Sequence, residues 1–295
     1  MNKYQFKVQD AKRVRVIIST DAACEADDQY AITHALMTPK FDRRGIVVAQ
    51  WGGQNRCPTV ARGFEEVEKI YSLMGIEGPA LYGGYDAPID SETHIVDNAG
   101  VDFIIEEARR ESDKRLFVLC LGAITDLAAA IIKAPDIQDK LTCIWIGGGF
   151  YPDGGFEFNS GNDYIAANVI MKSQVELWQV CMPCYIDMRV SYAELQAKVM
   201  PCGDIGKYLF DQLVKLGETA NWISGENWSL GDSPAVGLAI NNDIGEYYVR
   251  KAPLFDEHTR YIDCDTNREI RVYTKVDKRF ILEDMFAKLK INYGG

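Results

Sequence analysis

The strongest constraint on the fold is a regular alternation between short runs of continuous apolar residues and longer amphipathic stretches. Residues 14–20, 115–121 and 141–146 are Val-, Ile- and Leu-rich strand candidates, whereas 58–74 and 98–110 have helical spacing. Strands that are apolar along their whole length are buried on both faces, and the helices between them act as right-handed crossovers that cover those faces. The sequence therefore predicts an α/β fold with a doubly wound, mostly parallel sheet.

The alternation continues without an internal repeat, a low-complexity segment or a Pro/Gly/Ser-rich linker, so we expect a single domain over residues 1–295. We place the α/β core at about 13–190. The pattern then becomes more helical, which predicts a mainly helical C-terminal extension. Within this extension, residues 269–273 are expected to form an added strand beside 260–264.

Composition excludes some classes of partner. The formal net charge of −11 makes the chain a poor candidate for binding nucleic acid or an anionic membrane. No export signal and no apolar run of about 18 residues is present, so we expect a cytoplasmic protein. Its eight cysteines are then reduced thiols. Cys181 and Cys184 form a C-x-x-C pair, but a second pair that would complete a zinc site is missing.

The segment IISTDAACEADDQYAITHAL places Asp21, Glu25, Asp27 and Asp28 directly after the first predicted strand. In an open α/β sheet the active site lies at the carboxyl ends of the strands. Acidic side chains this close repel one another unless a cation, protonation or solvent neutralises them. Asp27 and Asp28 also begin a helix, whose dipole favours acidic residues, so a helix-start role and a metal site both remain open. All-oxygen ligands favour Ca²⁺ or Mg²⁺, and the absence of a P-loop favours Ca²⁺.

Four segments, in order, resemble motifs of the inosine–uridine nucleoside hydrolase family. The acidic segment resembles that family's D-x-D-P-G-x-D-D, and LCLGAITDLAAAI resembles G-P-L-T-N-L-A. IWIGGGF followed by FEFNSGNDYIAA resembles M-G-G followed by E-F-N, and SLGDSPAVGLAI resembles the H-D-P-x-A helix start. The match spans roughly residues 14–240. It implies the Rossmann-like nucleoside hydrolase fold and cleavage of the N-glycosidic bond of a ribonucleoside or ribosyl conjugate, which gives base and ribose.

The resemblance also implies a set of ligands for Ca²⁺. Asp21, Asp28 and Asp232 would bind the ion through their side chains and Thr125 through its carbonyl. Asp21 would in addition be the catalytic base for a water on the metal, which fits the ability of a cation to acidify water.

Substrate contacts follow from the same resemblance. Asp27, Glu157 and Asn159 would bind ribose hydroxyls, and the Asn that the family has after its second strand corresponds to Gln54 or Asn55. Trp228 is a candidate to stack on the base, with simple packing equally open. Family members are commonly oligomers, so we expect a homodimer or homotetramer that binds a small nucleoside or glycoside.

The chain departs from the family pattern at several positions. Ser19 replaces the first Asp of the acidic motif, and the turn from Asp21 to Asp27 is two residues longer. Gly231 stands where many members have the His that protonates the departing base. Activation of the leaving group must then differ, or the substrate is not a common nucleoside. Two alternatives stay open: a related glycosidase for another sugar conjugate, and a non-catalytic metal- or sugar-binding protein of the same fold.

Overall fold

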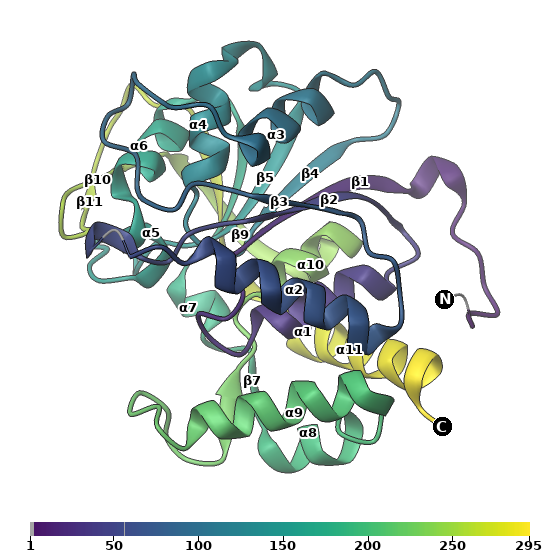
Figure 1. Ribbon diagram of the computed structural model, residues 1–295. Helices are drawn as coiled ribbons and strands as arrows, with labels where there is room; N and C mark the ends of the chain where they lie inside the picture. Colours follow the sequence, from purple (N-terminus) through teal and green to yellow (C-terminus); the bar gives the residue numbers. More distant parts are fainter. Residues whose placement is uncertain (1–2, 56) are drawn as a thin grey trace.

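The computed structural model describes residues 3–55 and 57–295. At its centre lies an eight-stranded sheet with the strand order β3-β2-β1-β4-β5-β6-β12-β9 (Figure 1). β9 runs antiparallel to β12, and every other neighbouring pair is parallel. The strands are β1 (Val14–Thr20), β2 (Phe41–Val48), β3 (Ala80–Gly83), β4 (Leu116–Cys120), β5 (Leu141–Ile146), β6 (Glu176–Val180), β9 (Gly245–Lys251) and β12 (Glu269–Val276). The predicted doubly wound, mostly parallel sheet is confirmed.

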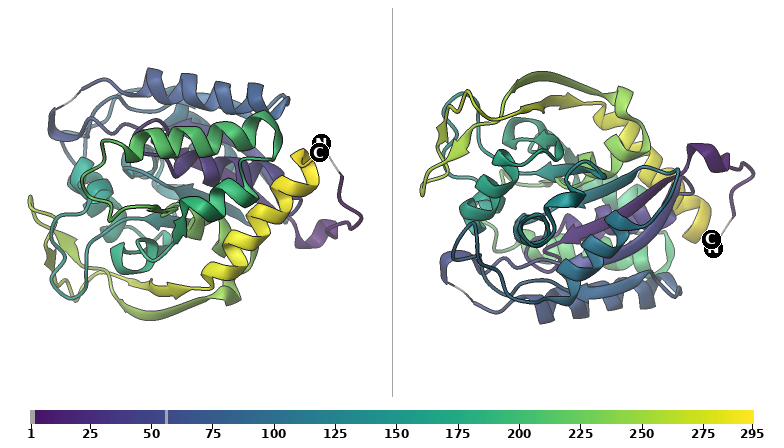
Figure 2. Two further views of the ribbon diagram at one scale, coloured as in Figure 1. Left: turned by 90° about the horizontal axis from the view of Figure 1, so that it is seen from below. Right: turned by 90° about the horizontal axis from the view of Figure 1, so that it is seen from above.

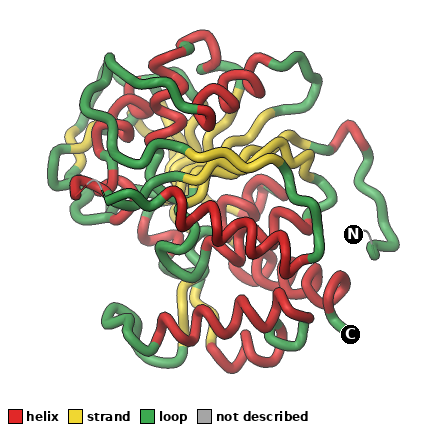
Figure 3. The backbone as a smooth tube through the Cα atoms, viewed as in Figure 1, coloured by secondary structure: helices red, strands yellow, loops and turns green. Residues whose placement is uncertain are grey.

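Helices cover both faces of the sheet, as Figures 2 and 3 show from three directions. The helices on one face are α3 (Ala99–Arg109), α4 (Thr125–Lys133) and α6 (Tyr164–Lys172). Those on the other are α1 (Asp28–Met37), α2 (Val60–Met74), α10 (Ser233–Ile240) and α11 (Lys278–Tyr293). In β1, Ile17 belongs to one of the two resulting cores, and Val16 and Ile18 belong to the other. Two cores explain why the strands are apolar at consecutive positions.

Shorter elements complete the chain. Next to the second helical layer lie α8 (Tyr192–Lys198), α9 (Gly203–Gly217) and the two-stranded pair of β7 (Arg189–Ser191) and β8 (Asn227–Ser229). The remaining elements are η1 (Asp10–Lys12), η2 (Gly53–Asn55), η3 (Pro135–Ile137), α5 (Phe158–Asn162), α7 (Met182–Tyr185), η4 (Asn242–Ile244), β10 (Leu254–Phe255) and β11 (Tyr261–Ile262).

The C-terminal part differs from the sequence-based expectation. β12 does not pair with residues 260–264; it lies between β6 and β9 in the main sheet, and β11 pairs with β10. Ile270, Val272 and Tyr273 of β12 are buried because the strand continues both cores past β6. The C-terminal part therefore supplies two strands of the central sheet in addition to its helices.

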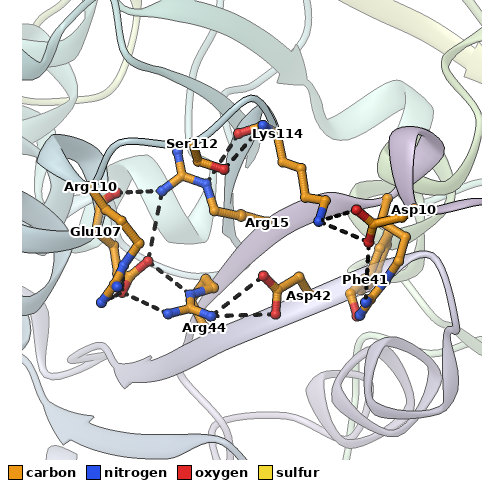
Figure 4. Close-up of polar contacts among 10 residues, drawn as sticks. Asp10, Arg15, Phe41, Asp42, Arg44, Glu107, Arg110, Ser112 and Lys114 are labelled. Atoms are coloured by element: carbon orange, nitrogen blue, oxygen red, sulfur yellow. Dashed lines mark hydrogen bonds and ion pairs between the residues drawn. The ribbon is translucent and has the colours of Figure 1, made fainter.

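A buried acidic side chain fixes the amino ends of β1 and β2 to α3 (Figure 4). Glu107 receives the guanidinium of Arg44 at 2.9 Å and that of Arg110 at 2.8 Å. Arg15 donates to the backbone carbonyl of Glu107 at 2.7 Å. Each charge here has an opposite partner, which is the condition for burying it at low cost. The pairing of charges is different at the carboxyl ends of the strands.

No helix within residues 3–55 and 57–295 is long and apolar enough to cross a membrane.

Candidate active site

The loop between β1 and α1 carries the acidic segment to the carboxyl edge of the sheet. It turns tightly after Asp21, whose carbonyl accepts the N–H of Cys24 at 3.0 Å, and Ala23 adopts a left-handed φ of 73°. Asp27 is the residue before α1, but its side chain makes no capping hydrogen bond to that helix. Helix capping therefore does not account for the carboxylate of Asp27.

Three carboxylates from two separate loops meet in the structure. The carboxylate oxygens of Asp27, Asp28 and Asp232 lie within 4.8 Å of one another. Asp232 comes from the loop between β8 and α10, and Asp28 also accepts a hydrogen bond from the hydroxyl of Thr20. Oxygen atoms at this separation can ligate a hard divalent cation such as Ca²⁺ or Mg²⁺.

Burial and mutual repulsion shape the protonation of these side chains. Burial, followed by the charge of Asp27, raises the pKa of Asp21 to about 7 and that of Glu25 to about 8. Burial raises the pKa of Asp27 to about 6, and it holds the pKa values of Asp28 and Asp232 well above their ordinary range. Among the described residues around this pocket none is Lys, Arg or His. A cation from solution is thus the partner that would keep the carboxylates ionised.

The carboxylates line a small pocket of about 80 Å³. Its other walls are Cys24, Leu121, Ile146, Phe158, Asn159, Tyr185 and Gly231. A larger groove of about 880 Å³ lies near the amino ends of β2 and β3, beside Tyr4, Phe41 and Pro79, at the opposite edge of the sheet. We assign the chemistry to the smaller pocket because only there do the acidic loops converge.

Glu157 organises one wall of the pocket. Its carboxylate accepts five hydrogen bonds: from the backbone N–H groups of Gly148, Asn159 and Ser160, from the Ser160 hydroxyl and from the Tyr185 hydroxyl. It thereby caps α5 and ties that helix to the loop after β5 and to α7. The predicted sugar-binding residue is thus also a structural anchor.

Asn159 bridges the ends of two central strands. Its amide nitrogen donates to the carbonyls of Leu121 at 2.7 Å and Ile146 at 2.9 Å. Both N–H groups are used in these bonds, so the amide oxygen is the group of Asn159 that can meet a substrate.

The other predicted site residues lie outside the pocket lining. Thr125 is the first residue of α4, and its hydroxyl donates to Asp163 at 2.9 Å. Asn55 is exposed at the end of η2, and the side chain of Gln54 lies outside the described part of the structure. Trp228 is only 2% exposed and packs edge-on against Trp222, which favours packing over base stacking.

Tyr185 is a pocket residue that the sequence analysis missed. The sequence over 175–185 is apolar enough to predict one strand, but β6 ends at Val180 and α7 follows, with Pro183 in its first turn. Pro183 was the signal in the sequence that the strand ends before it. Because functional residues follow strand ends, an earlier strand end would have indicated Tyr185 as a site residue.

The chain is similar in sequence to known proteins. Residues 16–283 match the model of the family described as inosine-uridine preferring nucleoside hydrolase. The chain is 25% identical over 259 residues to the pyrimidine-specific ribonucleoside hydrolase RihB of Escherichia coli strain SE11, covering 78% of this chain and 79% of that protein. It is 28% identical over 149 residues to the inosine-uridine preferring nucleoside hydrolase of Crithidia fasciculata, covering 48% and 46%.

The fold is also similar to solved structures. A purine-preferring ribonucleoside hydrolase from Gardnerella vaginalis superposes with a TM-score of 0.79 at 21% identity, covering 95% of this chain and 99% of the other. This likeness extends over the C-terminal strands as well as the core.

Proposed function

The chain belongs to the inosine-uridine preferring nucleoside hydrolase family, and on that premise we propose that it is a Ca²⁺-dependent enzyme that hydrolyses the N-glycosidic bond of a ribonucleoside. The products are the free base and ribose. The observation that supports this proposal best is the meeting of Asp27, Asp28 and Asp232 within 4.8 Å, in a pocket that Asp21 also lines and whose described lining has no basic side chain.

The proposed ligands of the ion are the side chains of Asp21, Asp28 and Asp232, with the carbonyl of Thr125 as the further ligand that the family resemblance suggests. The donor set fits a hard cation, because every ligand is an oxygen and the carboxylates are buried without cationic partners. Ca²⁺ is favoured over Mg²⁺ since it accepts irregular loops and more ligands. Bound there, the ion would supply positive charge that makes a water molecule more acidic.

Residues of the chain would perform the remaining tasks. Asp21 takes the proton of the attacking water, since its carboxylate lines the pocket in which the ion and the water would lie. Asp27, Glu157 and the amide oxygen of Asn159 accept hydrogen bonds from ribose hydroxyls. The anionic side chains around the sugar stabilise the positive charge that develops on it as the glycosidic bond breaks.

The experiment that tests this function measures two quantities on one sample. Calorimetric titration of chelator-treated protein with Ca²⁺ gives the stoichiometry, and a reducing-sugar assay gives ribose release from a nucleoside panel. We expect one ion per chain and release of ribose that requires it. Stoichiometric calcium without release from any nucleoside would refute the catalytic part, and absence of binding would refute the metal site.

We also propose a cellular location and an oligomeric state for the protein. We place the enzyme in the cytoplasm, where nucleosides are salvaged, and we expect a homodimer or homotetramer. Light scattering on the purified protein measures the assembly, and a monomer at micromolar concentration would contradict it.

A further inference from the structure

The pocket has few side-chain groups that could donate a proton or a hydrogen bond to a departing base. Of the described residues that line it, only Cys24, Asn159 and Tyr185 carry an N–H, O–H or S–H besides the carboxyl groups. Both N–H groups of Asn159 are bonded to strand-end carbonyls. The Tyr185 hydroxyl donates to Glu157 at 3.0 Å. The remaining thiol is a weak donor.

This shortage matters for the chemistry of the leaving group. When a neutral nucleoside is hydrolysed, the C1′–N bond breaks, its electron pair stays on the ring nitrogen, and the base must gain a proton to leave as a neutral molecule. Such general acid catalysis contributes roughly 10²–10⁴-fold to the rate. Carboxylates that bind a divalent cation are ionised, so they accept hydrogen bonds and do not donate them. Glu25, which lies outside the proposed ligand set, is the carboxyl group whose role as a donor the variant below tests.

The negative charge of the pocket lining also bears on which leaving group it can accept. Six carboxyl groups line it, those of Asp21, Glu25, Asp27, Asp28, Glu157 and Asp232. One divalent cation balances two of these charges, and ribose balances none. The rest favour a ligand that brings its own positive charge.

Aromatic side chains lie beside these carboxylates. Phe158 lines the pocket with 40% of its surface exposed, and the ring of Tyr185 lies against Gly231, whose added Cβ would be 3.2 Å from the Tyr185 Cδ2. Phe156, two residues before Phe158, is 82% exposed. Faces of aromatic rings attract cations, and flat heteroaromatic cations also stack on them.

We propose that the preferred substrate is a ribonucleoside whose base carries a permanent positive charge, such as an N-alkylated purine or a pyridinium base, and that Glu25, Phe158 and Tyr185 receive this base. The inference rests on the proposed function. The C1′–N bond breaks, its electron pair neutralises the ring nitrogen, and the base leaves without gaining a proton. Water forms the new C1′–O bond and gives one proton to Asp21, so the products are ribose, the neutral base and H⁺.

Glu25 is the carboxylate assigned to the charged base. It lies in the loop between Asp21 and Asp27 and lines the pocket, and like Asp21 it is not one of the three carboxylates within 4.8 Å of one another. Glu25 and Tyr185 line the same pocket. Glu25 therefore shares the pocket with the aromatic wall, and the ligand set that the family resemblance suggests does not include it.

The test compares nucleosides that differ by one charge. With Ca²⁺ and at mildly acidic pH, kcat/KM is measured for 7-methylguanosine and guanosine, and each value is divided by the rate constant of uncatalysed hydrolysis. Nicotinamide riboside and uridine form a second pair that separates pyridinium from purine bases. We expect the charged member of at least one pair to exceed the neutral one by about 100-fold. Equal values within both pairs would overturn the inference and leave the proposed function intact.

A variant separates charge recognition from acid catalysis. Glu25→Gln should lower kcat/KM for the preferred charged nucleoside by about tenfold and affect the neutral one less, because an amide keeps the shape and removes the charge. Glu111→Gln, at an exposed position, is the control and should change neither. A larger loss on the neutral nucleoside would identify Glu25 as an acid and overturn the inference. Calcium titration of the variant verifies that it is folded. If no nucleoside releases ribose although calcium binds, the proposed function fails and the inference with it.

Discussion

Replacing one carboxylate of the cluster should stabilise the protein while it destroys the metal site. Asp232 is 5% exposed, and its oxygens lie within 4.8 Å of those of Asp27 and Asp28. Two like charges at that separation repel by about 3 kcal/mol at an effective dielectric constant of about 20. Proton uptake relieves part of this repulsion from the two neighbours. For Asp232→Asn in chelator at pH 8 we therefore expect a net gain of about 3 kcal/mol, or a Tm higher by about 5–10 °C.

With calcium bound, the wild type should become more stable than Asp232→Asn. At a concentration of about 1,000 times Kd, a ligand of the folded state adds about 4.1 kcal/mol to the wild type, which exceeds the gain of about 3 kcal/mol from the substitution. Asp232→Asn lacks a ligand and should gain far less, and its ribose release should fall below detection.

The assay is thermal unfolding followed by fluorescence, with and without Ca²⁺. Asp243→Asn, at an exposed position in η4, is the matched control and should behave as wild type in both conditions. A variant that is less stable than wild type in chelator, or that keeps the full calcium shift, would refute the reasoning.

Three further outcomes follow from the same geometry. The folded-state pKa of Asp21 is raised from 3.8 to about 7, so its contribution to stability is complete below about pH 4 and is lost as the pH rises through 7. Between pH 5 and pH 8 in chelator, the free energy of unfolding should therefore fall by about 2.6 kcal/mol and Tm should fall with it, and a rise would contradict this. Gly122→Ala would place a Cβ 2.3 Å from the Asp21 Oδ1, so calorimetry should show calcium affinity at least about tenfold weaker, whereas Gly161→Ala, with no atom within 4 Å, should leave it unchanged. Asn159→Asp would set a carboxylate against two carbonyls and should cost about 2–4 kcal/mol in urea unfolding; a loss below 1 kcal/mol would show that the bridge contributes little.

The sequence predicted those parts of the fold that depend on local patterns. Mostly apolar runs located β1, β4 and β5 because burial on both faces leaves few polar positions in such strands. The position of β12 in the sheet could not be predicted from such a local pattern. A strand of eight residues has the same local pattern whether it pairs with β11 or enters the main sheet, and the choice is made by long-range packing against β6.

The candidate site was predictable where residues follow strands in order and less so where loops turn. Asp28 and Asp232, two of the expected ligands, lie together, whereas Asp21, the third expected carboxylate, lines the same pocket outside this group. Asp27 was expected to face the sugar alone, yet its carboxylate also lies with Asp28 and Asp232. The direction of one side chain in a loop depends on its backbone dihedrals, such as the left-handed φ of Ala23, and the identity of an Ala gives no indication of them.

The position of β12 has a consequence for how the chain reaches its native state. The strand that completes the β6 edge lies at residues 269–276, far along the chain from β6. During synthesis, the preceding part can assemble its parallel strands, but the β6 edge stays open until residues 269–276 have left the ribosome. An open edge of this kind is a template for pairing with another chain. Cells that produce the protein rapidly should therefore depend on chaperones during this interval, and truncation before residue 269 should yield aggregates instead of a smaller enzyme.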